Sequence, residues 1–180
     1  QVLAPMAEGF QRLAALRVDF GGVIPNKPFK LSIPTPPAPP DPNSPITADS
    51  QLFIAQEVDI FGQKKLMVVD TAALKDNNTR IETNSPPWPG CTAEGIYTMM
   101  INSIYQLSYI TGMMGSANAA VMCMDLVFIT SGLQFIMPIP INRNVTLTAR
   151  DLTTGETIFK QDLTGPTMQG QVYNFGVASN

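Results

Sequence analysis

The sequence predicts an all-β protein, a β-sandwich or jelly-roll domain with an extended Pro-rich N-terminal arm. Several segments alternate apolar and polar residues with a period of two, as strands with one buried face do. Charged residues make up 14% of the 180 residues, compared with about 25% in average soluble proteins, and uncharged polar residues, Pro and Gly are abundant. Thr is common in strands, whereas Pro and Gly mark the turns between them.

Residues 1–46 are predicted to form an N-terminal segment that precedes the sandwich. Within it, residues 6–16 place apolar side chains near helical spacing, which predicts one or two helical turns. Residues 17–25, RVDFGGVIP, predict a short strand that ends at Gly21 and Gly22.

A Pro-rich stretch, PTPPAPPDPNSP, follows from Pro34 to Pro45 and contains seven prolines. Proline fixes φ and lacks an amide donor, so this stretch predicts an extended polyproline II conformation. Its PxxP spacing would suit an SH3-type ligand. Because no basic anchor flanks it, we favour a rigid arm that leads across a neighbouring molecule or out of the body of the protein.

Residues 47–180 are predicted to form the β-sandwich domain, with about eight to ten strands. Gly62 and Gln63 separate two alternating segments and predict a hairpin, and Gly155 predicts a second hairpin turn because glycine readily takes positive φ. Pro138 and Pro140 predict an edge strand or the exit from one. The predicted strands lie within residues 52–61, 65–71, 80–84, 121–130, 133–141, 144–163 and 171–178, with turns at 76–78, 85–90 and 112–120.

Residues 95–111, GIYTMMINSIYQLSYIT, begin a region up to Asn142 in which Asp125 is the only charged residue. Large apolar or aromatic residues fill most of the odd positions, and Ile, Tyr and Thr are enriched, so strands are favoured although helical spacing fits in part. Asn102 and Ser103 predict either a hairpin turn or a bend between two strands. Polar residues interrupt every apolar window of about 20 residues, so no membrane span is expected.

The composition also argues against several functions. A net charge of −3 and a pI near 4.8 disfavour nucleic-acid binding, which needs clustered Lys and Arg. The chain has no histidine, which removes the commonest general base and metal ligand. We therefore expect no enzyme activity, no cofactor and no metal site.

Acidic residues are the remaining catalytic candidates. Glu57 and Asp59 would share one face of a strand, and Asp151 and Asp162 would lie near each other across a hairpin, as a pair of glycosidase carboxylates must. Nothing indicates a cleft, so we favour solvated strand faces. Residues 76–78 resemble part of a calcium loop but lack its Gly and distal Glu.

Two cysteines and the first residue leave alternatives open. Cys91 and Cys123 could form one disulfide or remain buried thiols, because two cysteines carry no spacing signature. Gln1 fits a terminus made by proteolysis or a numbering that begins inside a longer chain.

The weakly charged region predicts an assembly interface. Uncharged polar and apolar mixtures are typical of subunit interfaces, and methionine suits adaptable contacts. The alternatives are the inner layers of a single sandwich, or an aromatic platform for sugars formed by Trp88 and tyrosines. The predicted interface residues are Pro36, Pro37, Pro39, Pro40, Trp88, Tyr97, Met99, Tyr105, Tyr109, Met113 and Met114.

A family resemblance involves the runs KLMVVDTAALKDN, PPWPGCTAEGIYTMMI, YQLSYITG and VMCMDLVFI, within about residues 50–140. Their order of strand, polar turn, proline-glycine bend and strand resembles small β-rich virion proteins of tailed bacteriophages. The resemblance implies a non-enzymatic structural subunit of a capsid, of its decoration or of a head-tail junction, which contacts other copies of itself and neighbouring structural proteins. The alternatives are a secreted filament or surface-layer subunit, located outside the cell, and a carbohydrate-binding module.

Overall fold

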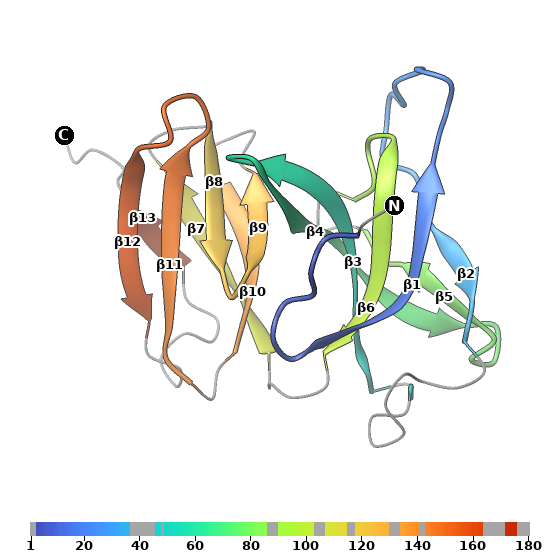
Figure 1. Ribbon diagram of the computed structural model, residues 1–180. Coiled ribbons are helices and arrows are strands. Elements are labelled where there is room, and N and C mark those ends of the chain that lie inside the picture. Colours follow the sequence, from blue (N-terminus) through green and yellow to red (C-terminus); the bar gives the residue numbers. More distant parts are fainter. Residues whose placement is uncertain are drawn as a thin grey trace. The chain divides into compact units, whose positions relative to one another are not determined.

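The computed structural model describes residues 3–36, 46–47, 49–85, 90–102, 107–114, 118–129, 134–140, 143–163 and 172–175. These residues form thirteen strands and no helix, so the all-β prediction is confirmed (Figure 1). Contacts divide the chain into two compact units. Unit 1 contains residues 1–57 and 68–104, and unit 2 contains residues 58–67 and 105–180.

Unit 1 is an antiparallel sheet in which the order of strands is β1-β6-β3-β4, with β5 paired to β4 and β2 paired to β5. Strands β3 and β4 each contribute residues to both units. The bounds are β1 (Phe10–Val18), β2 (Ser32–Pro34), β3 (Gln51–Ile60), β4 (Gln63–Lys75), β5 (Arg80–Thr83) and β6 (Gly95–Asn102).

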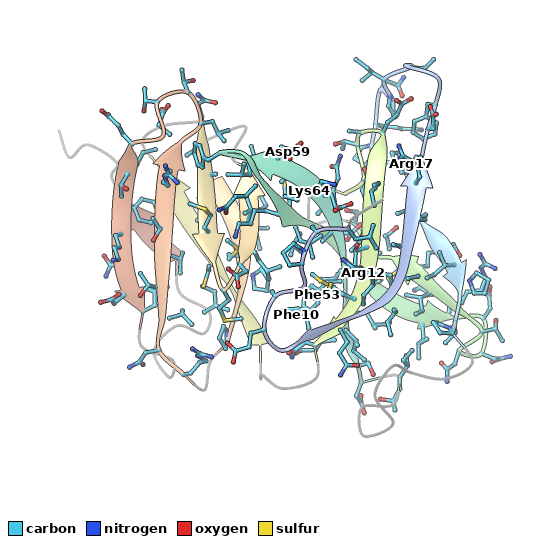
Figure 2. The ribbon with its side chains drawn as sticks, in the orientation of Figure 1. Phe10, Arg12, Arg17, Phe53, Asp59 and Lys64 are labelled. Carbon is cyan, nitrogen blue, oxygen red and sulfur yellow. The ribbon has the colours of Figure 1, made fainter. Side chains whose placement is uncertain are left out.

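The core of unit 1 is built around β6. Residues 97–101 of this strand are buried on both faces, and β6 is paired with β1 on one side and with β3 on the other. Phe10 of β1 and Phe53 of β3 meet edge to face, with 5.7 Å between ring centroids (Figure 2). An edge-to-face pair of buried aromatics contributes about 0.5–1.5 kcal/mol beyond the area that it buries.

The predicted helical turns at residues 6–16 are wrong, because most of this segment lies in β1. The register of β1 against β6 shifts between Arg12 and Ala14, so Leu13 forms a bulge. A bulge adds one residue to a strand and interrupts strict alternation. That interruption explains why Phe10, Leu13 and Leu16 follow one another at helix-like intervals.

The predicted boundary between residues 46 and 47 also differs from the structure. Strands β1 and β2 come before this boundary, yet both are hydrogen-bonded into the sheet of unit 1. The Pro-rich stretch is therefore a connection between β2 and β3 and not an N-terminal arm. Residues 37–45 of this stretch lie outside the described residues, so its predicted conformation stays a prediction.

Unit 2 contains two sheets. In the first sheet, Leu66 and Met67 of β4 pair with β9, which is followed by β8, β11 and β12. In the second sheet, the order is β10-β7-β13. Figure 1 shows the second sheet behind the first, which is the layered arrangement of a β-sandwich. The bounds are β7 (Leu107–Met114), β8 (Ala119–Cys123), β9 (Leu126–Ile129), β10 (Gln134–Pro140), β11 (Val145–Asp151), β12 (Thr157–Leu163) and β13 (Val172–Phe175).

Several strand predictions in unit 2 are confirmed. β11 and β12 form the expected hairpin, and Gly155 takes a φ of 76° in its turn. β10 pairs only with β7 among the described strands, so Pro138 and Pro140 lie on an edge strand as predicted. β6 and β7 belong to different sheets, so they do not form a hairpin. Asn102 is the last residue of β6, and Ser103 lies outside the described residues.

Residues 121–130 do not form the single strand that their apolar run predicts. They contain the hairpin of β8 and β9, whose turn residues Met124 and Asp125 both have positive φ, at 52° and 65°. Such two-residue turns usually contain Asn or Gly. The sequence therefore does not indicate this turn, because neither Asn nor Gly occupies its two positions.

Both cysteines are buried free thiols, so the disulfide alternative does not hold. Burial, together with the nearby Asp70 carboxylate, raises the pKa of Cys91 to about 12. Burial likewise raises the pKa of Cys123 to about 12. A thiolate is the reactive form of cysteine, so both thiols should be inert in the folded chain.

We expect neither cysteine to react with iodoacetamide in the native protein at about pH 8.5, where an ordinary thiol is half ionised. Both should react in denaturant, because unfolding exposes them. Mass spectrometry after quenching measures the two modifications separately. Rapid native alkylation of either residue would contradict this prediction.

Asp70 is the buried carboxylate of unit 1. Its Oδ1 accepts a hydrogen bond from the backbone N–H of Thr71 at 2.8 Å, and its Oδ2 accepts one from that of Ser85 at 3.1 Å. Burial raises its pKa above 3.8, although these hydrogen bonds oppose the shift. The folded state therefore binds this proton more tightly than the unfolded state, and the free energy of unfolding falls as pH rises through the raised pKa.

The Asp70→Asn variant should lack this component of the pH dependence. Asn retains one carbonyl oxygen as an acceptor but does not titrate, so the variant lacks the extra stability that binding of a proton gives wild type in acid. We expect wild type to exceed D70N in unfolding free energy by more at about pH 4 than at about pH 7, as measured by urea unfolding. D59N, at an exposed position, controls for the change in net charge, and a larger difference at the higher pH would contradict the assignment.

Candidate assembly surface

The most exposed apolar side chains of the described chain lie in one loop of unit 1. This apolar loop, residues 19–29, connects β1 to β2 and projects beyond the end of β1 in Figure 1. Val23 is 67% exposed and Ile24 is 85% exposed, and Phe20 beside them is 41% exposed. Fully burying a Val or Ile side chain is worth about 1.5–3 kcal/mol. The loop therefore presents apolar surface that a partner could bury.

The loop lies where the sequence predicts a short strand, at residues 17–25. Residues 17–25 contain the apolar run VIP directly after two glycines. Among residues 17–25, only Arg17 and Val18 belong to β1, whereas Gly21 and Gly22 take φ values of 66° and 87°. Glycine tolerates these values at little cost, and they turn the chain out of the strand.

Two carboxylates hold the backbone of the apolar loop. Glu94 Oε1 accepts hydrogen bonds from the backbone N–H groups of Phe20 at 2.6 Å and Gly22 at 2.9 Å. Asp19 Oδ1 accepts one from the N–H of Gly21 at 2.8 Å. A carboxylate that accepts backbone N–H bonds makes charge-assisted contacts, which are stronger than neutral ones. The exposed apolar side chains thus stand on a braced backbone.

Glu94 itself is positioned by the start of β6. Its backbone carbonyl accepts a hydrogen bond from Gln56 Nε2 at 3.2 Å. Gly95 has a φ of 147°, and a Cβ there would come within 3.2 Å of the same Gln56 nitrogen. The turn into β6 therefore favours glycine for both backbone conformation and space.

Aromatic rings connect the loop to the core. Phe20 packs edge to face on Phe29, with 5.1 Å between centroids, and Phe29 packs in the same way on buried Tyr97 at 6.1 Å. Phe29 is also fixed by its backbone N–H, which donates to the carbonyl of Cys91 at 2.8 Å. Tyr97 Oη donates to the carbonyl of Ala93 at 2.6 Å. These contacts link the outer ring of Phe20 to the strand at the centre of unit 1.

An open pocket of about 600 Å³ lies along the apolar loop. Its lining combines two aromatic rings and two prolines with one cation, Lys27, which is exposed. The nearby Lys30 instead pairs with Glu82 at 3.7 Å. The lining residues are Phe20, Val23, Pro25, Asn26, Lys27, Pro28 and Phe29.

The structure corrects the predicted interface at two positions. Tyr97 and Met99 are both 0% exposed, so they belong to the core of unit 1 and present no surface to a partner. Their burial also removes Tyr97 from any aromatic platform for sugars. The sequence predicts that these neutral side chains would be exposed unless a partner covered them, but the fold of unit 1 buries them.

The other predicted interface residues are placed only in part. Pro36 is half-buried just after β2. Tyr109, Met113 and Met114 lie in β7, but their side chains fall outside what the structure describes. Five further residues lie wholly outside the described residues, namely Pro37, Pro39, Pro40, Trp88 and Tyr105.

The acidic candidates do not form a pair. Glu57 is occupied by the N-terminal segment, because its Oε1 accepts a hydrogen bond from the backbone N–H of Ala4. Asp162 accepts from Thr146 Oγ1 at 2.7 Å, in register with Thr146 and not with Asp151. Asp151 lies at the other end of that hairpin, where the N–H groups of Thr154 and Thr153 lower its pKa. The expected proximity of Asp151 and Asp162 is therefore wrong.

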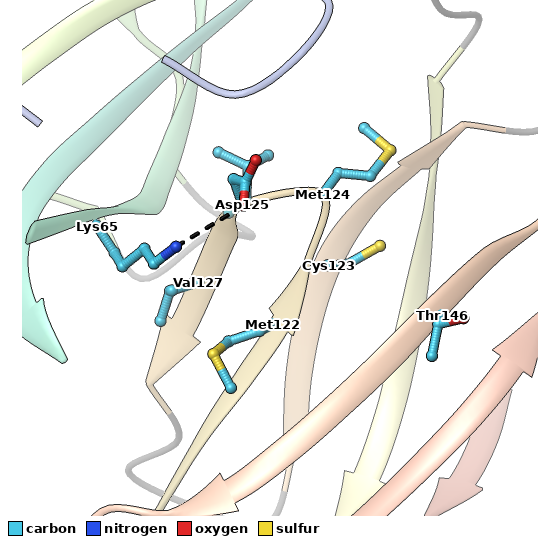
Figure 3. A pocket seen from close by; sticks show the side chains of 8 residues that line it. Lys65, Met122, Cys123, Met124, Asp125, Val127 and Thr146 are labelled. Carbon is cyan, nitrogen blue, oxygen red and sulfur yellow. Dashed lines mark ion pairs between the residues drawn. The ribbon is translucent and has the colours of Figure 1, made fainter. Parts of the chain in front are cut away.

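Unit 2 has a smaller pocket of about 150 Å³ at the β8–β9 turn (Figure 3). Asp125 pairs with Lys65 across it at 3.7 Å, so this lysine is not merely a solvated hairpin tip. Cys123 also lines the pocket, but its raised pKa keeps it protonated. The pocket combines this ion pair with the side chains of Met122 and Met124.

Within the described residues, no three or more Cys, Asp or Glu side chains are arranged to hold a metal ion. The same part of the chain contains no helix that is long and apolar enough to cross a membrane. Comparison with protein-family models, curated proteins and solved structures gave no match.

Glu94→Ala should loosen the apolar loop without unfolding unit 1. We expect amide hydrogen exchange of Phe20 and Gly22 to accelerate about tenfold, since each loses a hydrogen bond to a charged acceptor. Glu94→Gln retains a neutral acceptor oxygen and should have a smaller effect. The amide of Gly155, which donates to Asp151 in unit 2, is the internal control, and unchanged exchange at Phe20 and Gly22 in E94A would contradict the bracing role.

Proposed function

We propose that this protein is a non-enzymatic structural subunit of a multi-copy assembly. The observation that carries the proposal is the apolar loop, in which Val23 and Ile24 are 67% and 85% exposed on a hydrogen-bonded backbone. An exposed apolar cluster on a braced backbone loses little conformational freedom on contact, so less of the binding free energy is lost to ordering. Such a surface suits permanent contact with another protein.

The chemistry of the chain supports the same proposal. It has no histidine, and its two thiols are buried with pKa values raised to about 12. Of the acidic candidates, Glu57 and Asp162 are engaged in backbone or hydroxyl contacts. The buried neutral residues of β6 belong to the core of unit 1, so they do not support the proposal. It rests on the apolar loop.

The assembly that we propose in first place is a virion, as a capsid, capsid-decoration or head-tail component. This more specific proposal is supported by the resemblance of the strand and turn order to small virion proteins and by the charge-poor, Pro-rich and Thr-rich composition. A secreted filament or surface-layer subunit would use the apolar loop in the same way. Electron microscopy of the native particle or filament distinguishes the two.

The double variant V23D/I24D tests the assembly proposal. We expect self-association of the purified chain, measured by sedimentation velocity over a concentration series, to weaken at least about tenfold, because each substitution removes apolar contact worth more than 1.4 kcal/mol. Ile158→Asp is the matched control, since Ile158 is 36% exposed on β12 in unit 2.

Stability should stay within about 0.5 kcal/mol of wild type in V23D/I24D, because both positions are exposed. A wild-type chain that remains monomeric throughout the series would contradict the proposed function. So would self-association that responds to I158D and not to V23D/I24D.

A further inference from the structure

We propose that the pocket along the apolar loop binds the Pro-rich connection, residues 37–45, of a second copy of the chain. This inference rests on the proposed function, because it names the partner segment in the assembly. It predicts head-to-tail contacts, in which each copy offers its loop to one neighbour and its Pro-rich connection to another.

The lining of the pocket matches a proline-rich ligand. Recognition of polyproline II segments uses grooves lined by aromatic rings, on which proline rings pack with little loss of conformational entropy. Phe20 and Phe29 supply two rings set nearly at right angles, at 83°, and Pro25 and Pro28 add further rigid apolar surface. Phe29 is itself anchored on Tyr97. The receptor face is therefore preformed.

Charge also matches. Lys27 is the one cation among the residues that line the pocket, and no ion pair of Lys27 occurs within the described part of the chain. The Pro-rich connection carries a single charge, Asp41, in the middle of its prolines. The two carboxylates that hold the loop, those of Asp19 and Glu94, accept hydrogen bonds from its backbone N–H groups. Lys27 is thus the charged group available to Asp41.

Chain length disfavours binding of the molecule's own connection. The connection leaves after Pro36, beside Thr79, to which Thr35 is hydrogen-bonded, and the chain re-enters the sheet at Gln51, opposite Asn102 at the end of β6. The apolar loop lies at the other end of β6, where Val18 pairs with Gly95. Figure 1 shows β2 leading away from this loop.

The span that the connection would have to cover can be compared with its length. The seven residue steps from Phe29 to Pro36 and the seven from Gly95 to Asn102 each span about 23 Å at strand rise. A connection that reached its own loop and returned would therefore have to cover about 46 Å. Between Pro36 and Gln51 there are fifteen steps, or about 47 Å in polyproline II, and the hydrogen-bonded turn at Thr47 and Ser50 shortens this reach. The molecule's own connection therefore has no spare length to follow the pocket, whereas the connection of a second copy is not tethered in this way.

Isothermal titration and NMR with a capped peptide of residues 35–46, TPPAPPDPNSPI, test the inference. We expect binding to the full-length protein with a Kd below about 1 mM, and shifts confined to the apolar loop, including the amides of Phe20, Val23 and Lys27. Gly155 in unit 2 is the remote control. A peptide with P37A, P39A and P40A should bind about tenfold more weakly, because it lacks the preformed conformation.

A charge swap makes the test specific. K27E in the protein, or D41K in the peptide, should each weaken binding about fivefold, and the two together should restore it. Absence of binding, shifts away from the loop, or equal affinity for K27E and wild type would overturn the inference.

The two proposals fail in different ways. If the chain self-associates through Val23 and Ile24 but the peptide does not bind, the inference is overturned and the assembly function stands. If the peptide binds the loop with the expected charge swap but the full chain stays monomeric, the assembly function is overturned, together with the assignment of the partner to a second copy.

Discussion

Unit 1 depends on the burial of β6 between two paired neighbours. Residues 97–101 are enclosed on both faces, and β1 and β3 satisfy the hydrogen bonds along both edges. An unpaired backbone group in such a place would cost as much as a lost hydrogen bond, so the two neighbours are obligatory partners. Thr98 Oγ1 is buried in this strand without a hydrogen-bond partner among the described residues.

The position of the apolar loop follows from that strand. Gly95 and Glu94 lie where β6 begins, and the Glu94 carboxylate binds the backbone of the loop directly. Two residues into β6, Tyr97 supports Phe29, which supports Phe20. The most buried part of unit 1 and its most exposed apolar side chains are therefore joined by a short chain of contacts. A loop held in this way can keep Val23 and Ile24 in water instead of folding them back on the sheet.

Neutral side chains occupy two different settings in this chain. In β6 they lie in a strand with both faces covered, in which a charge would have to be desolvated. In the apolar loop, neutral side chains face water although the fold does not require it, and each forgoes the stabilisation that burial would give. Only the second kind of neutrality suggests a partner. Counting charged residues does not identify the loop, because Asp19 and Lys27 lie within it.

The sequence by itself determined the all-β class and the hairpins with strong turn signals. Gly155 and the alternation at residues 144–163 specify the β11–β12 hairpin locally, because turn conformation and strand period are properties of neighbouring residues. Tertiary structure alone decided that β1 is a strand with a bulge at Leu13 and that β8 and β9 turn at Met124 and Asp125. It also decided that Tyr97 is core and Val23 is surface. These outcomes depend on pairing between residues far apart in the chain, and a local pattern does not record which of two apolar residues another strand will cover.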